Sequence, residues 1–140
     1  MNVNLVAGSI VNTINNLRIR SNSVIIYDID RTLLHDNGKP IVPIVWTYNY
    51  ALCKGLRPVI ITAREGSQEN IEKTKTQLYD SGIRGYKNMY FRPREIQDVA
   101  KYKYLARKDI FEKGDEALIS VGDMDWDIGL YGGFGFKIDY

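Results

Sequence analysis

The sequence predicts an α/β protein with three layers, in which a central parallel sheet of about five strands is covered by helices on both faces. Two observations lead to this prediction. Short apolar runs of strand length recur along the chain, and segments of helical length and period separate them from residue 24 onward. Regular alternation of this kind is typical of parallel sheets joined by right-handed crossovers. Because 140 residues suffice for one hydrophobic core, we expect a single domain over residues 1–140, with 1–23 as an N-terminal helical extension.

Five apolar runs are the predicted strands. Val24–Tyr27, Arg57–Thr62 and Ala117–Val121 are the strongest, and such continuous apolar runs are typical of strands buried on both faces. Asn88–Phe91 and Gly135–Ile138 are weaker. They complete the predicted sheet.

Helices are predicted between these strands. Val42–Cys53, Ser67–Asp80 and Val99–Glu112 carry apolar residues at helical spacing. Leu5–Leu17 is predicted as an additional helix packed on the sheet. The order of strands and helices therefore favours a parallel sheet covered by helices.

Composition narrows the class of protein. A hydrophobic fraction of 44% and a charged fraction of 26% are typical of a folded globular protein. The net charge of +2 is too small to indicate nucleic-acid binding by itself. The first twenty residues resemble neither a signal peptide nor a membrane span, so we expect a soluble, cytoplasmic protein with no membrane partner. Cys53, the only cysteine, is expected in the core.

Polar residues follow the three strongest strands. They are Asp28 and Asp30 after the first, Thr62, Ala63 and Arg64 after the second, and Asp123, Asp125 and Asp127 after the third. Because ligands bind outside the carboxyl ends of parallel strands, we interpret these residues as one site. If the first strand continues through Asp30, the carboxylates of Asp28 and Asp30 face the same mouth. Oxygen ligands of this kind suit Mg²⁺, the predicted cofactor.

These residues resemble the motifs of the haloacid dehalogenase superfamily of phosphatases. Asp28-Ile29-Asp30-Arg31-Thr32-Leu33-Leu34 is similar to the first motif, Ile61-Thr62-Ala63-Arg64 to the second, and Gly122-Asp123-Met124-Asp125-Trp126-Asp127 to the fourth. Lys103-Tyr104-Leu105-Ala106-Arg107 is similar to the stretch that carries the third motif in the class B and related subfamily III acid phosphatases. The resemblance covers about residues 24–138 and implies a Rossmann-like core. Neither interval between the motifs has room for a cap domain.

The resemblance also implies a role for each matched residue. Asp28 would attack phosphorus to form an aspartyl-phosphate, and Asp30 would protonate the leaving oxygen and later activate water. Thr62 and Ala63 would bind phosphoryl oxygens, while Lys103 would neutralise charge on Asp28 and the phosphate. The metal ligands would be Asp28, Asp123 and the carbonyl of Asp30. The supporting residues would be Thr32, Arg64, Arg107 and Asp127, with Asp125 as the alternative to Asp127.

Three functions are compatible with these motifs. The first is a magnesium-dependent phosphomonoester hydrolase acting on a phosphorylated small molecule, which the spacing of Lys103 and Arg107 favours. The second is a polynucleotide 3′-phosphatase, because Met89–Arg94 resembles a segment of bacteriophage polynucleotide kinase phosphatase domains, and basic residues interleaved with aromatic ones suit a nucleic-acid end. The third is a catalytically silent binding domain, which the presence of Asp28, Asp30 and Asp123 disfavours.

An uncapped site is open to water. The resemblance to capless phosphatases therefore suggests either a macromolecular substrate end or a partner subunit that excludes water from the site. A homo-oligomer is accordingly kept among the expected partners.

Overall fold

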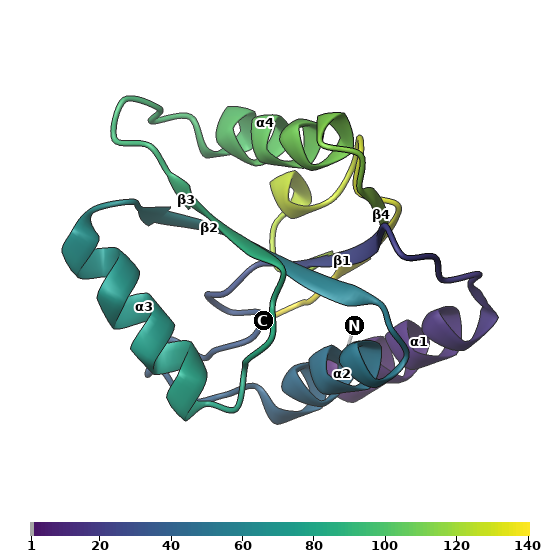
Figure 1. Ribbon diagram of the computed structural model, residues 1–140. Helices are drawn as coiled ribbons and strands as arrows, with labels where there is room; N and C mark the ends of the chain where they lie inside the picture. Colours follow the sequence, from purple (N-terminus) through teal and green to yellow (C-terminus); the bar gives the residue numbers. More distant parts are fainter. Residues whose placement is uncertain (1) are drawn as a thin grey trace.

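A sheet of parallel strands forms the centre of the computed structural model, which describes residues 2–140 (Figure 1). The strands are β1 (Ser23–Tyr27), β2 (Arg57–Glu65), β3 (Asn88–Arg92), β4 (Glu116–Gly122) and β5 (Phe134–Lys137). They form a 5-stranded sheet in the order β3-β2-β1-β4-β5, and every neighbouring pair is parallel. This confirms the predicted fold class.

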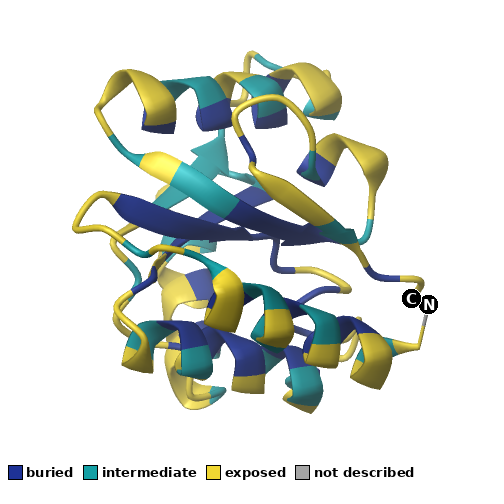
Figure 2. Ribbon diagram, turned by 90° about the vertical axis from the view of Figure 1, so that its right-hand side faces the viewer, coloured by how far each residue is buried: buried dark blue, intermediate teal, exposed yellow. Residues whose placement is uncertain are grey.

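Helices cover both faces of the sheet. α1 (Val3–Asn16), α2 (Val42–Cys53) and α3 (Gln68–Asp80) lie on one side, and α4 (Val99–Glu112) lies on the other with the short 3₁₀ helix η1 (Asp125–Asp127) (Figure 1). In Figure 2 the helices turn their buried residues toward the sheet and their exposed residues outward. This is the three-layer arrangement expected of a Rossmann-like fold without an inserted cap.

The central strand β1 divides the core into two halves. All five of its residues are buried, and successive side chains point to opposite faces. Ile25 and Tyr27 pack in the cluster that contains α1 and α2, whereas Val24 and Ile26 pack in the cluster that contains α4. Continuing this alternation by one residue directs Asp28 toward α4.

The strand order also determines where the ends of β1 and β4 meet. The chain moves outward from β1 to β3 and then returns to the other side of β1 as β4. Tyr27 of β1 lies opposite Val121 of β4, so the residues that follow these two strands emerge side by side. In open parallel sheets such a reversal of strand order creates the crevice in which ligands bind.

Cys53 lies on the surface, so the expectation that it packs in the core was wrong. The buried residues of α2 are Ile44, Thr47, Tyr48 and Ala51, which form one stripe at helical spacing. Cys53 is the last residue of α2 and lies off this stripe, so the general preference of cysteine for the interior has no effect here.

None of the helices among the described residues is both long enough and apolar enough to cross a lipid bilayer.

Candidate active site

Asp28 is the first residue after β1 and is only 8% exposed. Its backbone N–H donates to the carbonyl oxygen of Val121 in β4, at 3.0 Å. Its Oδ1 accepts a hydrogen bond from Lys103 Nζ at 2.8 Å, and its Oδ2 accepts one from the hydroxyl of Thr32 at 3.2 Å. Both oxygens of this carboxylate are therefore held in place from two different segments of the chain.

Lys103 enters the site from α4 and is 2% exposed. Its ammonium lies 2.8 Å from Asp28 Oδ1, 2.7 Å from Asp127 Oδ1 and 2.7 Å from the carbonyl oxygen of Ile61. Burial lowers the pKa of Lys103, but the charges of Asp28 and Asp127 together outweigh burial and raise it. The ammonium is therefore kept charged inside the protein.

Asp127 belongs to the site and Asp125 does not. Asp127 is 4% exposed, and its Oδ2 accepts a hydrogen bond from the Met124 N–H at 3.0 Å. A Cβ at Gly122 would overlap the Asp127 side chain, so this close approach requires glycine. The Asp125 side chain is 89% exposed and pairs with Lys137 instead.

Arg107 supports the segment that carries Asp127. Its side chain is buried and donates from Nε to the carbonyl of Leu130 at 2.8 Å and from Nη1 to the carbonyl of Trp126 at 2.7 Å. Lys103 and Arg107 lie four residues apart on α4, so they share one face of the helix. One of these cations contacts the carboxylates and the other fixes the loop that supplies Asp127.

Three carboxylates meet beside this lysine. Oxygens of Asp28, Asp123 and Asp127 all lie within 4.8 Å of one another. Burial raises the pKa of Asp28 to about 7, with Lys103 opposing the rise and Asp127 adding to it, and burial also raises the pKa of Asp123. When all three are ionised, the one ammonium leaves two negative charges uncompensated. A divalent cation with oxygen ligands, such as Mg²⁺, fits both this charge and this set of donors.

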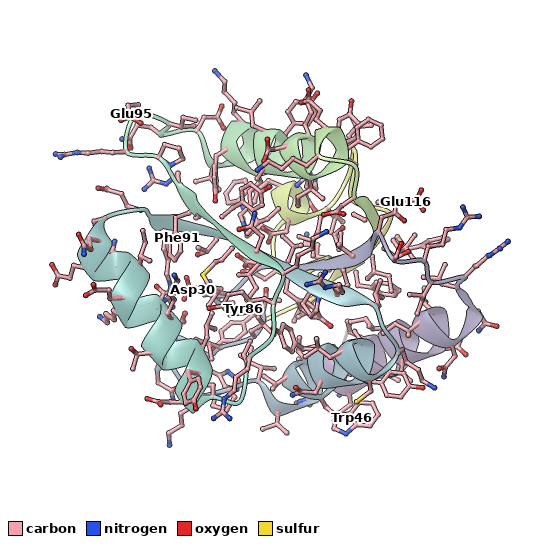
Figure 3. The ribbon with its side chains drawn as sticks, viewed as in Figure 1. Asp30, Trp46, Tyr86, Phe91, Glu95 and Glu116 are labelled. Atoms are coloured by element: carbon pink, nitrogen blue, oxygen red, sulfur yellow. The ribbon has the colours of Figure 1, made fainter. Side chains whose placement is uncertain are left out.

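β1 ends at Tyr27, so the strand does not continue through Asp30 and the expected alternation of Asp28 and Asp30 does not apply. The amides of Thr32, Leu33 and Leu34 all donate to the carbonyl of Ile29, so the chain turns away from the strand direction there. The Asp30 side chain is 53% exposed and binds Arg64, with Arg64 Nε 3.0 Å from Oδ2 and Nη2 2.7 Å from Oδ1. Figure 3 labels Asp30 beside α3. The third carboxylate of the acidic cluster is that of Asp127.

Thr62 and Ala63 lie inside β2, which extends to Glu65 rather than ending at Thr62 as expected. Thr62 is fully buried, and its Oγ1 accepts a hydrogen bond from the backbone N–H of Arg64 at 3.1 Å. The carbonyl of Ala63 accepts a hydrogen bond from Arg92 Nε at 3.0 Å. The contact of Lys103 with Ile61 places this segment next to Asp28.

Several contacts of the site were missed at the level of sequence. Arg64 also donates hydrogen bonds to Thr74 and Gln77 of α3. The sequence shows only that these two polar residues are three apart and so share one face of the helix, which does not identify Arg64 as their partner. Arg31 has a left-handed φ of 60°, pairs with Asp36 and lies over the ring of Tyr140. Tyr140 therefore reaches the loop that follows Asp28.

Comparison with known proteins gives one family. The sequence model of the HAD superfamily, subfamily IIIB (acid phosphatase), matches residues 35–132, which is more than half of the chain. The match includes Thr62, Lys103 and Asp123 and begins after Asp28 and Asp30. No curated protein matches the chain. The contact between Lys103 and Asp28 joins the matched region to the first motif. The chain belongs to the haloacid dehalogenase superfamily, subfamily IIIB, and is a phosphatase.

Proposed function

We propose that this phosphatase hydrolyses phosphomonoesters of small molecules in a magnesium-dependent reaction, with Asp28 as the nucleophile. One observation carries the proposal: a nearly buried carboxylate at the end of β1 shares one ammonium, that of Lys103, with a second acid. Because a phosphate ester repels a carboxylate, attack requires positive charge beside both of them. Lys103 supplies part of that charge.

Of the three clustered acids, Asp28 and Asp123 would hold Mg²⁺ together with the carbonyl of Asp30, as the family resemblance implies, while Asp127 would stay paired with Lys103 and the Met124 amide. When bound, the ion would offset the remaining negative charge of the carboxylates and the phosphate. Lys103 would keep the Asp28 carboxylate in one orientation throughout.

The reaction would proceed in two displacements. An oxygen of Asp28 forms a bond to phosphorus while the ester P–O bond breaks, and the leaving oxygen takes a proton from Asp30. Water then gives a proton to Asp30 and attacks phosphorus, which breaks the bond to Asp28 and releases phosphate. The hydroxyl of Thr62, which accepts from Arg64, retains its own proton to donate to a phosphoryl oxygen.

Hydrolysis of p-nitrophenyl phosphate tests this proposal. Activity should require Mg²⁺, disappear with EDTA, and fall about a thousandfold or more in Asp28→Asn, because the nucleophile is lost. Asp125→Asn, in the exposed acid of the fourth motif, is the matched control and should retain activity. A brief reaction with ³²P-labelled substrate should leave acid-stable label on the wild type alone. Full activity of Asp28→Asn would refute the assignment.

Three cations of the basic stretch 92–108, which suggested a nucleic-acid end, are engaged inside the protein, and this favours the small-molecule reading. Arg92 donates to the carbonyls of Ala63 and Ile96, while Lys103 and Arg107 make the internal contacts described above. These three cations therefore stabilise the site and its loops. A strong, salt-sensitive preference for 3′-phosphorylated oligonucleotides over mononucleotides would reverse this choice.

A further inference from the structure

Arg64 is held on two sides. Its Nε and Nη2 donate to the two oxygens of Asp30, at 3.0 and 2.7 Å. Its Nη1 donates to Thr74 Oγ1 at 3.1 Å and to Gln77 Oε1 at 2.8 Å. A guanidinium has five N–H donors in one plane, and these contacts occupy most of them. Arg64 therefore serves as a bridge from α3 to Asp30, and Lys103 is the cation that faces the nucleophile.

The α3 end of this bridge is rigid. Thr74 is 1% exposed, and Leu78 on the same helix is fully buried in the core. Gln77 is confined on its other side by the loop that follows the first motif, since a Cβ at Gly38 would lie 2.7 Å from Gln77 Nε2. The two acceptors for Nη1 are thus fixed by the packing of α3, and they in turn fix the plane of the guanidinium.

We propose that Thr74 and Gln77 are positioning residues for Asp30 and act through Arg64. The inference rests on the proposed function, in which Asp30 is the acid and base. Asp30 lies on a loop and is half exposed, so its own packing leaves the carboxylate free to rotate. A planar, bidentate partner holds both carboxylate oxygens in one orientation. Without the acceptors on α3, the guanidinium turns and Asp30 turns with it.

The two steps of the reaction, formation and hydrolysis of the aspartyl-phosphate, should not depend equally on this bridge. In the second step Asp30 must take a proton from the attacking water, which requires its carboxylate to be held in one orientation. p-Nitrophenolate leaves without needing a proton, so with this substrate Asp30 matters mainly when the aspartyl-phosphate is hydrolysed. Loosening the bridge should therefore slow the second step and cause the covalent intermediate to accumulate.

Two substitutions on α3 test the inference. Gln77→Met removes the acceptor at similar length, and Thr74→Val removes the hydroxyl at similar shape. For each we expect kcat on p-nitrophenyl phosphate to fall about tenfold and KM to fall with it, so that kcat/KM changes little, because slower hydrolysis of the aspartyl-phosphate lowers both constants. The pre-steady-state burst of p-nitrophenol should grow toward one per enzyme molecule. Thr76→Val, in an exposed threonine of the same helix, is the matched control and should change neither quantity.

If Thr74 and Gln77 act through Asp30, the effects of their substitutions on kcat should not add to the effect of Asp30→Asn. In an Asp30→Asn background, Gln77→Met and Thr74→Val should have no further effect on kcat, because the group that they position is gone. Gln77→Glu and Thr74→Ser keep the acceptors and should restore most of the rate. A tenfold loss that persists in the Asp30→Asn background, or full kcat and no burst in the single variants, would overturn the inference.

An NMR measurement separates this inference from the proposed function. In the substrate-free protein, the Arg64 Nε–H signal should be protected from solvent exchange in the wild type and lose protection in Gln77→Met. Unchanged protection contradicts the bridge whatever the activity. Absence of Asp28-dependent hydrolysis in the wild type refutes the proposed function instead.

Discussion

Lys103 is the residue on which the acidic site depends most. Its buried ammonium lies between Asp28 and Asp127 and is the shared partner of both. Burial of an ionised lysine is costly, and these two carboxylates are what offset the cost. Removing the ammonium would in turn leave two buried acids facing each other.

Replacing Lys103 by Met should therefore destabilise the protein and abolish activity. At pH 8 without metal we expect a loss of about 3 kcal/mol in the free energy of unfolding, because breaking a buried ion pair leaves uncompensated charge. At pH 5 the loss should be smaller, since Asp28, whose pKa burial raises to about 7, can bind a proton. Urea denaturation at both pH values measures this, with the exposed Lys101→Met as control. Equal losses at the two pH values would contradict the explanation.

Asp28 should also make the stability of the metal-free protein depend on pH. Burial raises the pKa of its carboxyl from 3.8 to about 7, so the folded state binds this proton more tightly than the unfolded chain. The contribution of Asp28 to stability should thus be greatest at low pH and decline as the pH rises through this interval. Urea titrations in EDTA from pH 4 to 8 should give a steeper decline for the wild type than for Asp28→Asn. Parallel curves would remove Asp28 as the source.

Among the secondary-structure elements, η1 depends most on its neighbours. It is a single turn between β4 and β5, and it brings Asp127 against Gly122. Arg107 of α4 holds the carbonyls on either side of Ile128, at Trp126 and Leu130. The position of this acid is therefore set by a glycine and an arginine from outside its own turn.

Gly122→Ala should displace Asp127. The new Cβ would overlap its side chain, so we expect a loss of about 1–3 kcal/mol in stability, as for other overpacked sites, together with most of the phosphatase activity. Gly8→Ala is the control, because a Cβ there meets nothing within 4 Å and α1 should gain up to about 1 kcal/mol. Thermal denaturation and p-nitrophenyl phosphate hydrolysis measure both effects. An active, stable Gly122→Ala protein would show that η1 can relax.

At the level of the complete fold, the site joins the two halves of the sheet. Asp28 follows β1, Asp123 follows β4, and Lys103 comes from the helix that precedes β4. These groups meet only when β4 pairs with β1. A ligand bound by both acids would therefore stabilise the folded chain as a unit.

Mg²⁺ should raise the melting temperature of the wild type. At a free concentration 100 times its dissociation constant, a ligand specific for the folded state adds about 2.7 kcal/mol to stability. The shift should vanish in Asp123→Asn and persist in Asp125→Asn, whose carboxylate lies outside the cluster. A shift of equal size in Asp123→Asn would indicate binding elsewhere.

The sequence by itself determined the elements and most of the candidate site. Helical and strand periodicity depends on neighbours along the chain, so α2 and α4 begin and end where their patterns predict. The acids at the ends of β1 and β4 could be identified for the same reason. The predicted end of β2 was three residues early, because apolar character ceases there while strand pairing with β3 continues to Glu65.

Only the tertiary structure decided the partners of these residues. It selected Asp127 over Asp125, paired Asp30 with Arg64, and left Cys53 exposed. Each outcome depends on side chains that are far apart in the chain and meet only after the strands have taken their order. A local pattern carries no information about which distant group will lie opposite, because that is set by the crossovers and by the turn at the end of each strand.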